Sequence, residues 1–145
     1  MIRRGEKDMG RISIEVELTN AEDLTRVKDG TLAPDKVRRV RLLGWVDTGA
    51  SYLVIPASVV HQLGLPEKGQ AGVRYADRRT ETRKVVDQVN VALLGRDGTF
   101  KAIVEPGRTD ALIGAIVLED LDLLVDCRTQ TLQPRDPTQI IAEIE

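Results

Sequence analysis

The amino-acid sequence predicts a mainly β fold with one or two short helices. Residues 11–18 (RISIEVEL) alternate apolar and polar side chains, which is the pattern of a strand with one buried face. Several later runs are rich in branched apolar residues, whereas short helices are predicted only at residues 56–65 and 115–121. The chain has 145 residues, of which 41% are hydrophobic, and this is the size and apolar content of one domain.

The first half of the chain predicts strands, one helix and one long loop. Residues 37–47 (VRRVRLLGWVD) predict a strand that ends at a carboxylate, and residues 52–55 (YLVI) predict a short strand stopped by Pro56. Residues 56–65 begin with proline and end beside a glycine, which indicates a short helix. The polar segment 19–36 holds a glycine and a proline, so we expect a long loop or a mobile insertion there.

The second half predicts two successive hairpins and then a short helix. The first hairpin joins residues 72–76 to 81–94 through a polar, charged tip at 76–80. The second hairpin turns at 95–98 (GRDG) and continues into 99–105. The remaining elements are the apolar segment 111–114, the helix 115–121, and the strands 123–126 and 131–134 on either side of a turn near Arg128.

Composition excludes several classes of protein. The net charge is only -2 although 30% of the residues are charged, so no strong global field attracts nucleic acid or an anionic membrane. The longest apolar run, residues 111–118, is far shorter than a membrane span, and residues 1–10 lack the apolar core of a secretory signal. Cys127 is the only cysteine, which excludes an intramolecular disulfide framework. We therefore expect a soluble cytoplasmic protein that binds neither nucleic acid nor a membrane.

The segment WVDTGASYLVIP, residues 45–56, carries the strongest chemical signal. Asp47 follows an apolar strand, and a carboxylate there needs hydrogen-bond donors, of which Thr48 and the amides around Gly49 are the nearest. We expect Gly49 to adopt a positive φ and to leave room for another group to approach the carboxylate. Peptide hydrolysis by carboxylates needs two of them sharing a proton, yet the sequence holds no second Asp-Thr-Gly. A two-fold dimer would bring Asp47 of each chain together.

VDTGAS, followed about sixty residues later by ALIG and a short helix, closely resembles the retropepsin-like aspartic proteases. These are the single-domain, dimeric relatives of pepsin, and the chain resembles their bacterial members in particular. The resemblance covers residues 11–134 and matches the order of the predicted elements. It implies a closed β-barrel, the acid-protease half-fold, in a homodimer. The single domain would span 1–145, with an N-terminal extension at 1–10 and a C-terminal tail at 135–145.

The resemblance also implies roles for individual residues, without a metal or another cofactor. Asp47 resembles the catalytic aspartate, contributed once per subunit. Thr48 resembles the threonine whose hydroxyl links the two active-site loops, Gly49 resembles the glycine that orients the carboxylates, and Ala50 and Ser51 complete the supporting loop. The second motif, which packs beneath this loop, consists of Leu112, Ile113 and Gly114. The substrate-covering flap corresponds to Tyr75, Ala76, Asp77, Arg78, Arg79 and Thr80.

Two departures from the viral pattern concern the flap and the dimer. The flap tip has no glycine but holds Arg78 and Arg79, so it favours acidic substrate segments or closes poorly. Viral relatives often pair an Arg and an Asp near the dimer interface, where this chain has Ala115-Ile116 and Ser51-Tyr52. Either apolar contacts from the C-terminal segment 138–145 hold the dimer, or that segment is a frayed tail. The apolar side chains of this segment are Ile140, Ile141 and Ile144.

Other chemically suggestive residues have simpler explanations. His61 is the only histidine, and a surface or helix-end position suits it better than a metal site or a general base. Cys127 follows a predicted strand and is interpreted as a small core residue. Acidic residues near the second helix fit a solvated face better than a metal site; they are Glu119, Asp120 and Asp122. Basic residues along the strands fit solvated faces better than phosphate binding; they are Lys36, Arg38, Arg39, Arg41, Arg78, Arg79, Arg83 and Lys84.

These observations lead to a first hypothesis and two alternatives. The first is an aspartic endopeptidase that acts as a homodimer on polypeptides, with water activated between the two Asp47 carboxylates. The second is a catalytically weak or inactive dimeric module on the same fold that binds peptides or assists assembly. A nucleic-acid partner held by the arginine-bearing hairpin ranks last, because the overall charge is slightly acidic.

Overall fold

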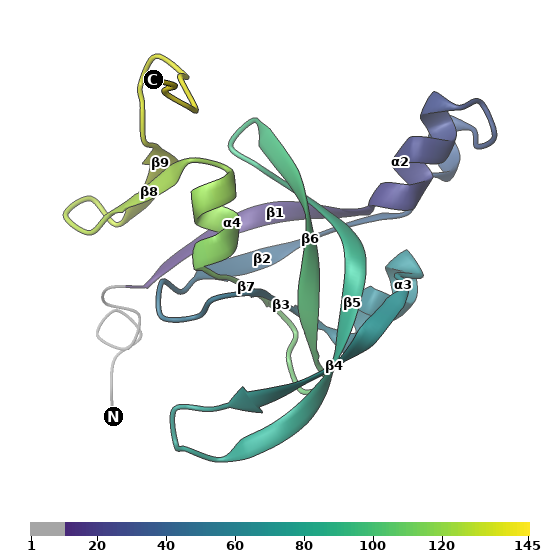
Figure 1. Ribbon diagram of the computed structural model, residues 1–145, viewed down its shortest axis with the longest axis horizontal. Helices are drawn as coiled ribbons and strands as arrows, with labels where there is room; N and C mark the ends of the chain where they lie inside the picture. Colours follow the sequence, from purple (N-terminus) through teal and green to yellow (C-terminus); the bar gives the residue numbers. More distant parts are fainter. Residues whose placement is uncertain (1–10) are drawn as a thin grey trace.

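The structure is a computed structural model that describes residues 11–145, so the predicted extension at 1–10 lies outside the described residues (Figure 1). The strands are β1 (Ile12–Asn20), β2 (Arg39–Val46), β3 (Leu53–Pro56), β4 (Glu67–Arg74), β5 (Thr80–Leu93), β6 (Arg96–Glu105), β7 (Ala111–Ile113), β8 (Leu123–Asp126) and β9 (Thr131–Pro134). The helices are α2 (Ala21–Lys28), the 3₁₀ helix η1 (Pro34–Lys36), α3 (Ala57–Leu63) and α4 (Ala115–Asp120). Within the described part of the chain, no helix is long and apolar enough to cross a membrane.

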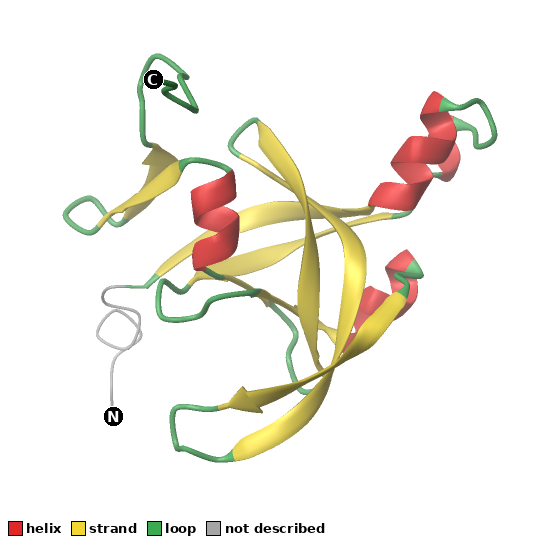
Figure 2. Ribbon diagram, viewed as in Figure 1, coloured by secondary structure: helices red, strands yellow, loops and turns green. Residues whose placement is uncertain are grey.

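Six of these strands form a closed barrel. Neighbouring strands follow the order β1-β2-β7-β3-β6-β5, and β5 also pairs with β1, so the sheet closes on itself. The β2–β7 and β3–β6 pairs are parallel, whereas the other pairs in the ring are antiparallel. Strands β8 and β9 form a separate two-stranded sheet beside α4 (Figure 2). The predicted mainly β, closed-barrel fold is therefore confirmed.

The barrel interior is filled by the apolar side of each strand. In β1 the buried Ile12, Val16 and Leu18 alternate with more exposed polar residues, as the sequence predicts. Side chains from several strands and from two helices complete one core; the largest fully buried apolar ones are Leu18, Leu53, Ile55, Leu63, Ile113, Val16, Val89, Val91 and Val117. Burial of this apolar surface is the main force that stabilises the barrel.

The expectation of a loop or mobile insertion over residues 19–36 is wrong. Strand β1 continues to Asn20, and α2 and η1 follow it, with α2 extending to one side of the barrel (Figure 1). The side chain of Asn20 accepts a hydrogen bond from the Asp23 amide at 3.1 Å and so caps α2. The Asn20 amide group also donates to the Leu63 carbonyl at 2.8 Å. The polar residues that suggested a loop thus begin a helix and tie it to α3.

The second hairpin turn also differs from the prediction. It lies at Leu94-Gly95, two residues before the predicted centre, because Leu93 pairs with Arg96. Both turn residues have positive φ, 50° at Leu94 and 74° at Gly95. A two-residue hairpin turn of this kind matches the twist of the strands, which explains why the turn is tighter than GRDG at 95–98 suggested. Residues 11–145 also contain three short α-helices rather than one or two.

Strand β5 is unusually long and belongs to two parts of the molecule. Its first residues pair with β4 in a two-stranded ribbon that leaves the barrel (Figure 1). Its last residues pair with both β6 and β1 inside the barrel. The pairing register shifts between Val86 and Val89, and Gln88 has a φ of 63°. This irregularity follows Val85 and Val86, which pair with both β4 and β6, and so lies at the junction of the ribbon and the barrel.

Candidate functional site

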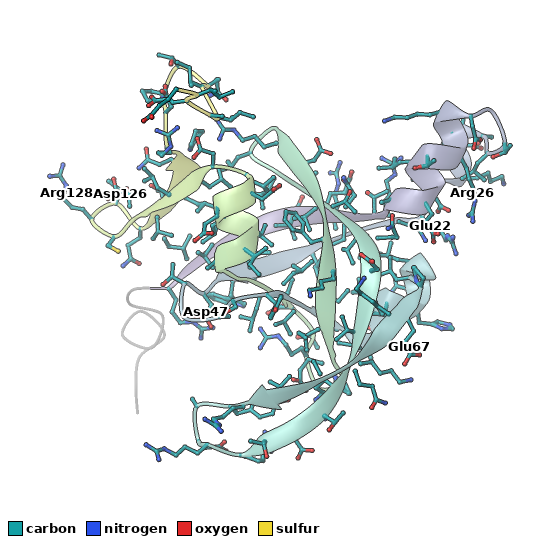
Figure 3. All side chains as sticks on the ribbon, viewed as in Figure 1. Glu22, Arg26, Asp47, Glu67, Asp126 and Arg128 are labelled. Atoms are coloured by element: carbon teal, nitrogen blue, oxygen red, sulfur yellow. The ribbon has the colours of Figure 1, made fainter. Side chains whose placement is uncertain are left out.

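Asp47 begins the loop that connects β2 to β3 (Figure 3). Its amide donates to the Ile113 carbonyl at 3.0 Å, and its Oδ1 atom accepts a hydrogen bond from the Gly49 amide at 2.9 Å. Asp47, Thr48 and Gly49 are all exposed in the single chain. The carboxylate is therefore oriented by the backbone of its own turn and is open to solvent.

Gly49 does not adopt the positive φ that we expected, and its role is steric. A Cβ atom at this position would lie 3.3 Å from Oδ1 of Asp47, which is closer than most Cβ contacts. The glycine thus leaves room at the carboxylate. The local turn is instead closed by the Gly49 amide and by the Ala50 amide, which donates to the Asp47 carbonyl at 3.2 Å.

The second sequence motif lies directly against this loop. Strand β7 runs between β2 and β3, with Val46 paired to Ile113 and Val54 paired to Leu112. At Gly114 an added Cβ would lie only 2.4 Å from the Tyr52 carbonyl oxygen, so the close approach requires glycine. Beyond it, the Ala115 amide donates to the Ala50 carbonyl at 2.8 Å. The structure thus brings together the two motifs that the sequence places about sixty residues apart.

A cavity of about 750 Å³ opens beside Asp47, between the Asp47 loop and the β4–β5 ribbon. Several predicted site residues line it: Asp47, Gly49, Ala50, Ser51, Tyr75, Ala76 and Leu112. Tyr52, Val54, Ala71, Gly72, Val73, Arg74, Ile103, Glu105 and Arg108 complete the lining. The other predicted site residues do not line it; they are Thr48, Asp77, Arg78, Arg79, Thr80, Ile113 and Gly114.

The ribbon ends in a turn at residues 75–79, within the predicted flap and starting one residue before the predicted tip at 76–80. The Arg78 amide donates to the Tyr75 carbonyl and the Tyr75 amide to the Arg79 carbonyl, each at 2.9 Å. Asp77 accepts a hydrogen bond from the Arg79 amide at 3.0 Å. Arg78 has a φ of 69°, so an arginine occupies the left-handed position for which glycine is usually favoured. Thr80 already belongs to β5.

Tyr75 joins this ribbon to the barrel through a charged pair that the sequence did not reveal. The Tyr75 hydroxyl donates to Oε2 of Glu105 at 2.5 Å, and Nε of Arg83 donates to Oε1 of Glu105 at 3.0 Å. The hydrogen bond to Glu105, together with burial, raises the pKa of Tyr75 above its usual value. Arg79 lies over the Tyr75 ring with its guanidinium carbon 4.6 Å from the ring centre. The network fixes the ribbon near the end of β6.

Arg108 is a second wall residue that sequence reasoning missed. It lies in the loop between β6 and β7, where its Nε atom donates to the Asp110 carbonyl at 3.0 Å. The side chain of Asp110 in turn accepts a hydrogen bond from the Trp45 indole at 3.1 Å. No local sequence signal marks Arg108, because its position depends on how this loop packs against β2.

The remaining candidate residues lie away from this cavity. His61 is exposed on α3, as expected. Cys127 is exposed in the turn after β8, so its interpretation as a core residue is wrong; the strand ends one residue earlier, and the turn points the thiol outward. Among residues 11–145, no cluster of three or more His, Cys, Asp or Glu side chains could hold a metal ion.

Comparison with known proteins agrees with this geometry. A family model described as aspartyl protease matches residues 33–116, which are 84 of the 145 residues. The matched region includes the Asp47 loop, the β4–β5 ribbon and the start of α4. No curated protein matches the sequence. Because the family match covers more than half of the chain, the protein belongs to the retropepsin-like aspartyl proteases.

Proposed function

We propose that the protein is an aspartic endopeptidase that works as a homodimer in the cytoplasm. The observation that carries this proposal is the exposed Asp47 carboxylate on the wall of a cavity of about 750 Å³. The carboxylate is oriented by a backbone amide, and its loop is tied to β7 and α4. A family member with this arrangement is equipped to activate water beside a bound peptide.

Residues 11–145 do not supply a pair of free carboxylates to the cavity. Asp47 and Glu105 are the acidic residues that line the cavity within residues 11–145. Both oxygens of Glu105 already accept hydrogen bonds, from the Tyr75 hydroxyl and from Arg83. Since hydrolysis by carboxylates needs two that share a proton, the second one is best provided by Asp47 of another copy. The exposure of the Asp47 loop leaves it accessible to such a partner.

In this mechanism, one Asp47 carboxylate is ionised and the other is protonated. The ionised carboxylate takes a proton from the water whose oxygen attacks the scissile carbonyl carbon. The protonated carboxyl group gives its proton to the carbonyl oxygen. Together, these two transfers and the attack of water produce a tetrahedral gem-diol intermediate. Cleavage of the C–N bond then returns a proton to the leaving amine. Thr48 would link the two loops through its hydroxyl, and Gly49 keeps the carboxylate accessible.

The substrate would be an extended polypeptide segment. Among residues 11–145, strand β4 is at the edge of the sheet and pairs with β5 alone, which leaves the other side of its backbone to pair with a peptide. Residues of β4 also line the cavity. Main-chain pairing would thus hold the peptide between the ribbon and the Asp47 loop, with side chains alternating between the two walls.

Cleavage of a diverse peptide library between pH 3 and 8, with products identified by mass spectrometry, tests the proposal. The unaltered protein should cut, and Asp47→Asn should lose at least about 10³-fold in rate. Asp35→Asn is a matched control, because Asp35 is exposed and does not line the cavity. Equal cutting by Asp47→Asn and the unaltered protein would contradict the proposal. Binding without cutting by either protein would favour the peptide-binding module.

Mixing unaltered and Asp47→Asn chains tests the shared site. If each active site needs Asp47 from two chains, an equal mixture that re-equilibrates its dimers should retain about a quarter of the activity of the same total amount of unaltered protein. Sites formed by one chain would instead retain about half. Dilution should also lower the activity per chain, because dimers dissociate.

A further inference from the structure

The charges on the cavity wall are not balanced within the described part of the chain. Four charged residues line the cavity: Asp47, Arg74, Glu105 and Arg108. Glu105 is compensated by Arg83, whose Nε atom lies 3.0 Å from its Oε1 atom. Neither Arg74 nor Arg108 forms an ion pair with another residue of the 11–145 region. The cavity lining therefore includes two arginines that have no ion pair among residues 11–145, against the single carboxylate of Asp47.

Arg108 is held in a way that presents its charge to a ligand. Its Nε atom donates to the Asp110 carbonyl at 3.0 Å, and its backbone amide donates to the Glu105 carbonyl at 3.3 Å. The Trp45–Asp110 hydrogen bond of 3.1 Å anchors the same loop to β2. The side chain is half-buried, and its two terminal nitrogens have no acceptor among residues 11–145. An arginine fixed at Nε with free terminal nitrogens is suited to bind a carboxylate through charge-assisted hydrogen bonds.

We propose that Arg108, assisted by Arg74, selects peptide substrates that carry an acidic side chain near the cleavage site. This inference rests on the proposed peptidase function and names the substrate class of the same site. A carboxylate of Asp or Glu matches the planar guanidinium and compensates a charge that the described chain leaves unpaired. Arg74 lies on the ribbon side of the cavity and adds a second positive charge along the peptide path.

Two-fold symmetry makes the inference sharper. A homodimeric cleft would present Arg108 twice, once from each subunit, on opposite sides of the scissile bond. The preference for an acidic side chain should therefore appear at two positions that are equally distant from the cut. A substrate acidic at both positions should be cleaved faster than one acidic at either position alone.

The test uses peptide pairs that differ only by Glu or Gln at each position around a cleaved bond. The unaltered protein should cleave the Glu peptide of the responsive pair about 10- to 100-fold faster in kcat/KM. In Arg108→Gln this Glu/Gln ratio should fall about tenfold or more, and Arg108→Lys should retain part of it, because lysine keeps the charge without the planar fork. Arg128→Gln is the matched control, since Arg128 lies in the β8–β9 turn, away from the cavity, and should keep the ratio (Figure 3).

A binding measurement separates this inference from the proposed chemistry. Fluorescence anisotropy measures the binding of labelled Glu and Gln peptides to Asp47→Asn and needs no cleavage. The combined Asp47→Asn, Arg108→Gln variant should lose the preference for the Glu peptide that Asp47→Asn shows.

Peptides with an amidated C-terminus distinguish an acidic side chain from a terminal carboxylate. Loss of all preference on amidation would overturn the side-chain assignment. An unchanged Glu/Gln ratio in Arg108→Gln would overturn the inference even if the protein is a peptidase. Equal cleavage by Asp47→Asn would overturn the peptidase function, while the binding ratio still decides the role of Arg108.

Discussion

Asp23 and Asp47 are both carboxylates close to the end of a β-strand, yet their surroundings are opposite. The Asp23 side chain is only 2% exposed and accepts hydrogen bonds from Nε, Nη2 and the backbone amide of Arg38, at 2.9, 3.0 and 3.0 Å. Arg26 adds a further contact at 3.2 Å. Asp47 is exposed, and among residues 11–145 its carboxylate accepts a hydrogen bond from the Gly49 amide alone. Figure 3 shows Asp47 on the opposite side of the barrel from Arg26 and α2.

The difference separates a carboxylate that supports the fold from one that is free to react. Burial of Asp23 is tolerated because Arg38 and Arg26 satisfy its charge, and this closed arrangement ties α2 to the start of β2. Asp47 contributes little to such a network, so its oxygens remain available to water, substrate or a second chain. A carboxylate left open by a well-ordered loop is therefore the better candidate for chemistry.

The largest expected effect on stability comes from removing the partner of the buried carboxylate. Arg38→Met should lower the free energy of unfolding by about 3–5 kcal/mol, because the buried Asp23 charge then keeps only Arg26 and the backbone amide of residue 38 as partners. Urea denaturation measures the change. Arg39→Met is the matched control: its ion pair with Glu17, at 3.6 Å, is at the surface, so its loss should cost at most about 1 kcal/mol. Equal losses in the free energy of unfolding for Arg38→Met and Arg39→Met would mean that the buried Asp23 does not support the fold as proposed.

A smaller loss of stability is expected where the Asp47 loop meets the second motif. Gly114→Ala would place a Cβ atom 2.4 Å from the Tyr52 carbonyl oxygen, so the loop must move. We expect a loss of about 1–3 kcal/mol in the free energy of unfolding together with lower peptidase activity. Gly107→Ala serves as control, because an added Cβ there meets nothing within 4 Å. Unchanged stability and activity in Gly114→Ala would show that the loop is more adaptable than its geometry indicates.

The pH dependence of stability gives a still smaller effect and isolates Asp23. The hydrogen bonds from the Arg38 side chain lower the pKa of Asp23 below its ordinary value of 3.8. The stabilisation of the folded state by ionised Asp23 is therefore complete above about pH 3.8. This stabilisation is lost as the pH falls through the lowered pKa of Asp23. The stability difference between the unaltered protein and Asp23→Asn should shrink over this acidic range. A difference that stays constant down to pH 2 would mean that the charge of Asp23 does not matter.

The smallest effect on stability is expected at the proposed catalytic residue. Asp47→Asn should change the free energy of unfolding of dilute, dissociated chains by no more than about 0.5 kcal/mol, since Asn can still accept the hydrogen bond from Gly49. The same variant should lose peptidase activity. Thermal and urea denaturation measure the first property, and the library assay measures the second. A destabilised Asp47→Asn would mean that the carboxylate also has a structural role.

Local sequence patterns predicted much of the fold. The alternation in β1 and the branched residues of β2 and β5 predicted strands, because one face of each packs into the barrel. Pro56 and Gly64 correctly bracketed α3. Asp47 was predicted as the chemically important residue because a carboxylate followed by Thr-Gly interrupts an apolar pattern.

Other features depend on contacts between distant segments and could not be predicted. Helix α2 is short and polar, and it is fixed by Asn20 bonding to Leu63 and by Asp23 bonding to Arg38. The turn at Leu94-Gly95 places leucine at a positive φ, which sequence preference disfavours. Arg108 reaches the cavity because its loop packs on Trp45 through Asp110. These positions follow from tertiary packing, and local sequence patterns carry no information about contacts between distant segments.

Because β5 belongs to both the β4–β5 ribbon and the barrel, its amide protons should exchange at two different rates. Within the described part of the chain, residues 80–84 pair with β4 alone, whereas residues 89–92 are held between β6 and β1. Amide protons in the first group should exchange with deuterium through local opening of the ribbon, and those in the second group through unfolding of the whole barrel. One continuous strand would then show two protection levels, with the boundary near Gln88. Local opening of the ribbon would then leave intact the barrel that holds the Asp47 loop.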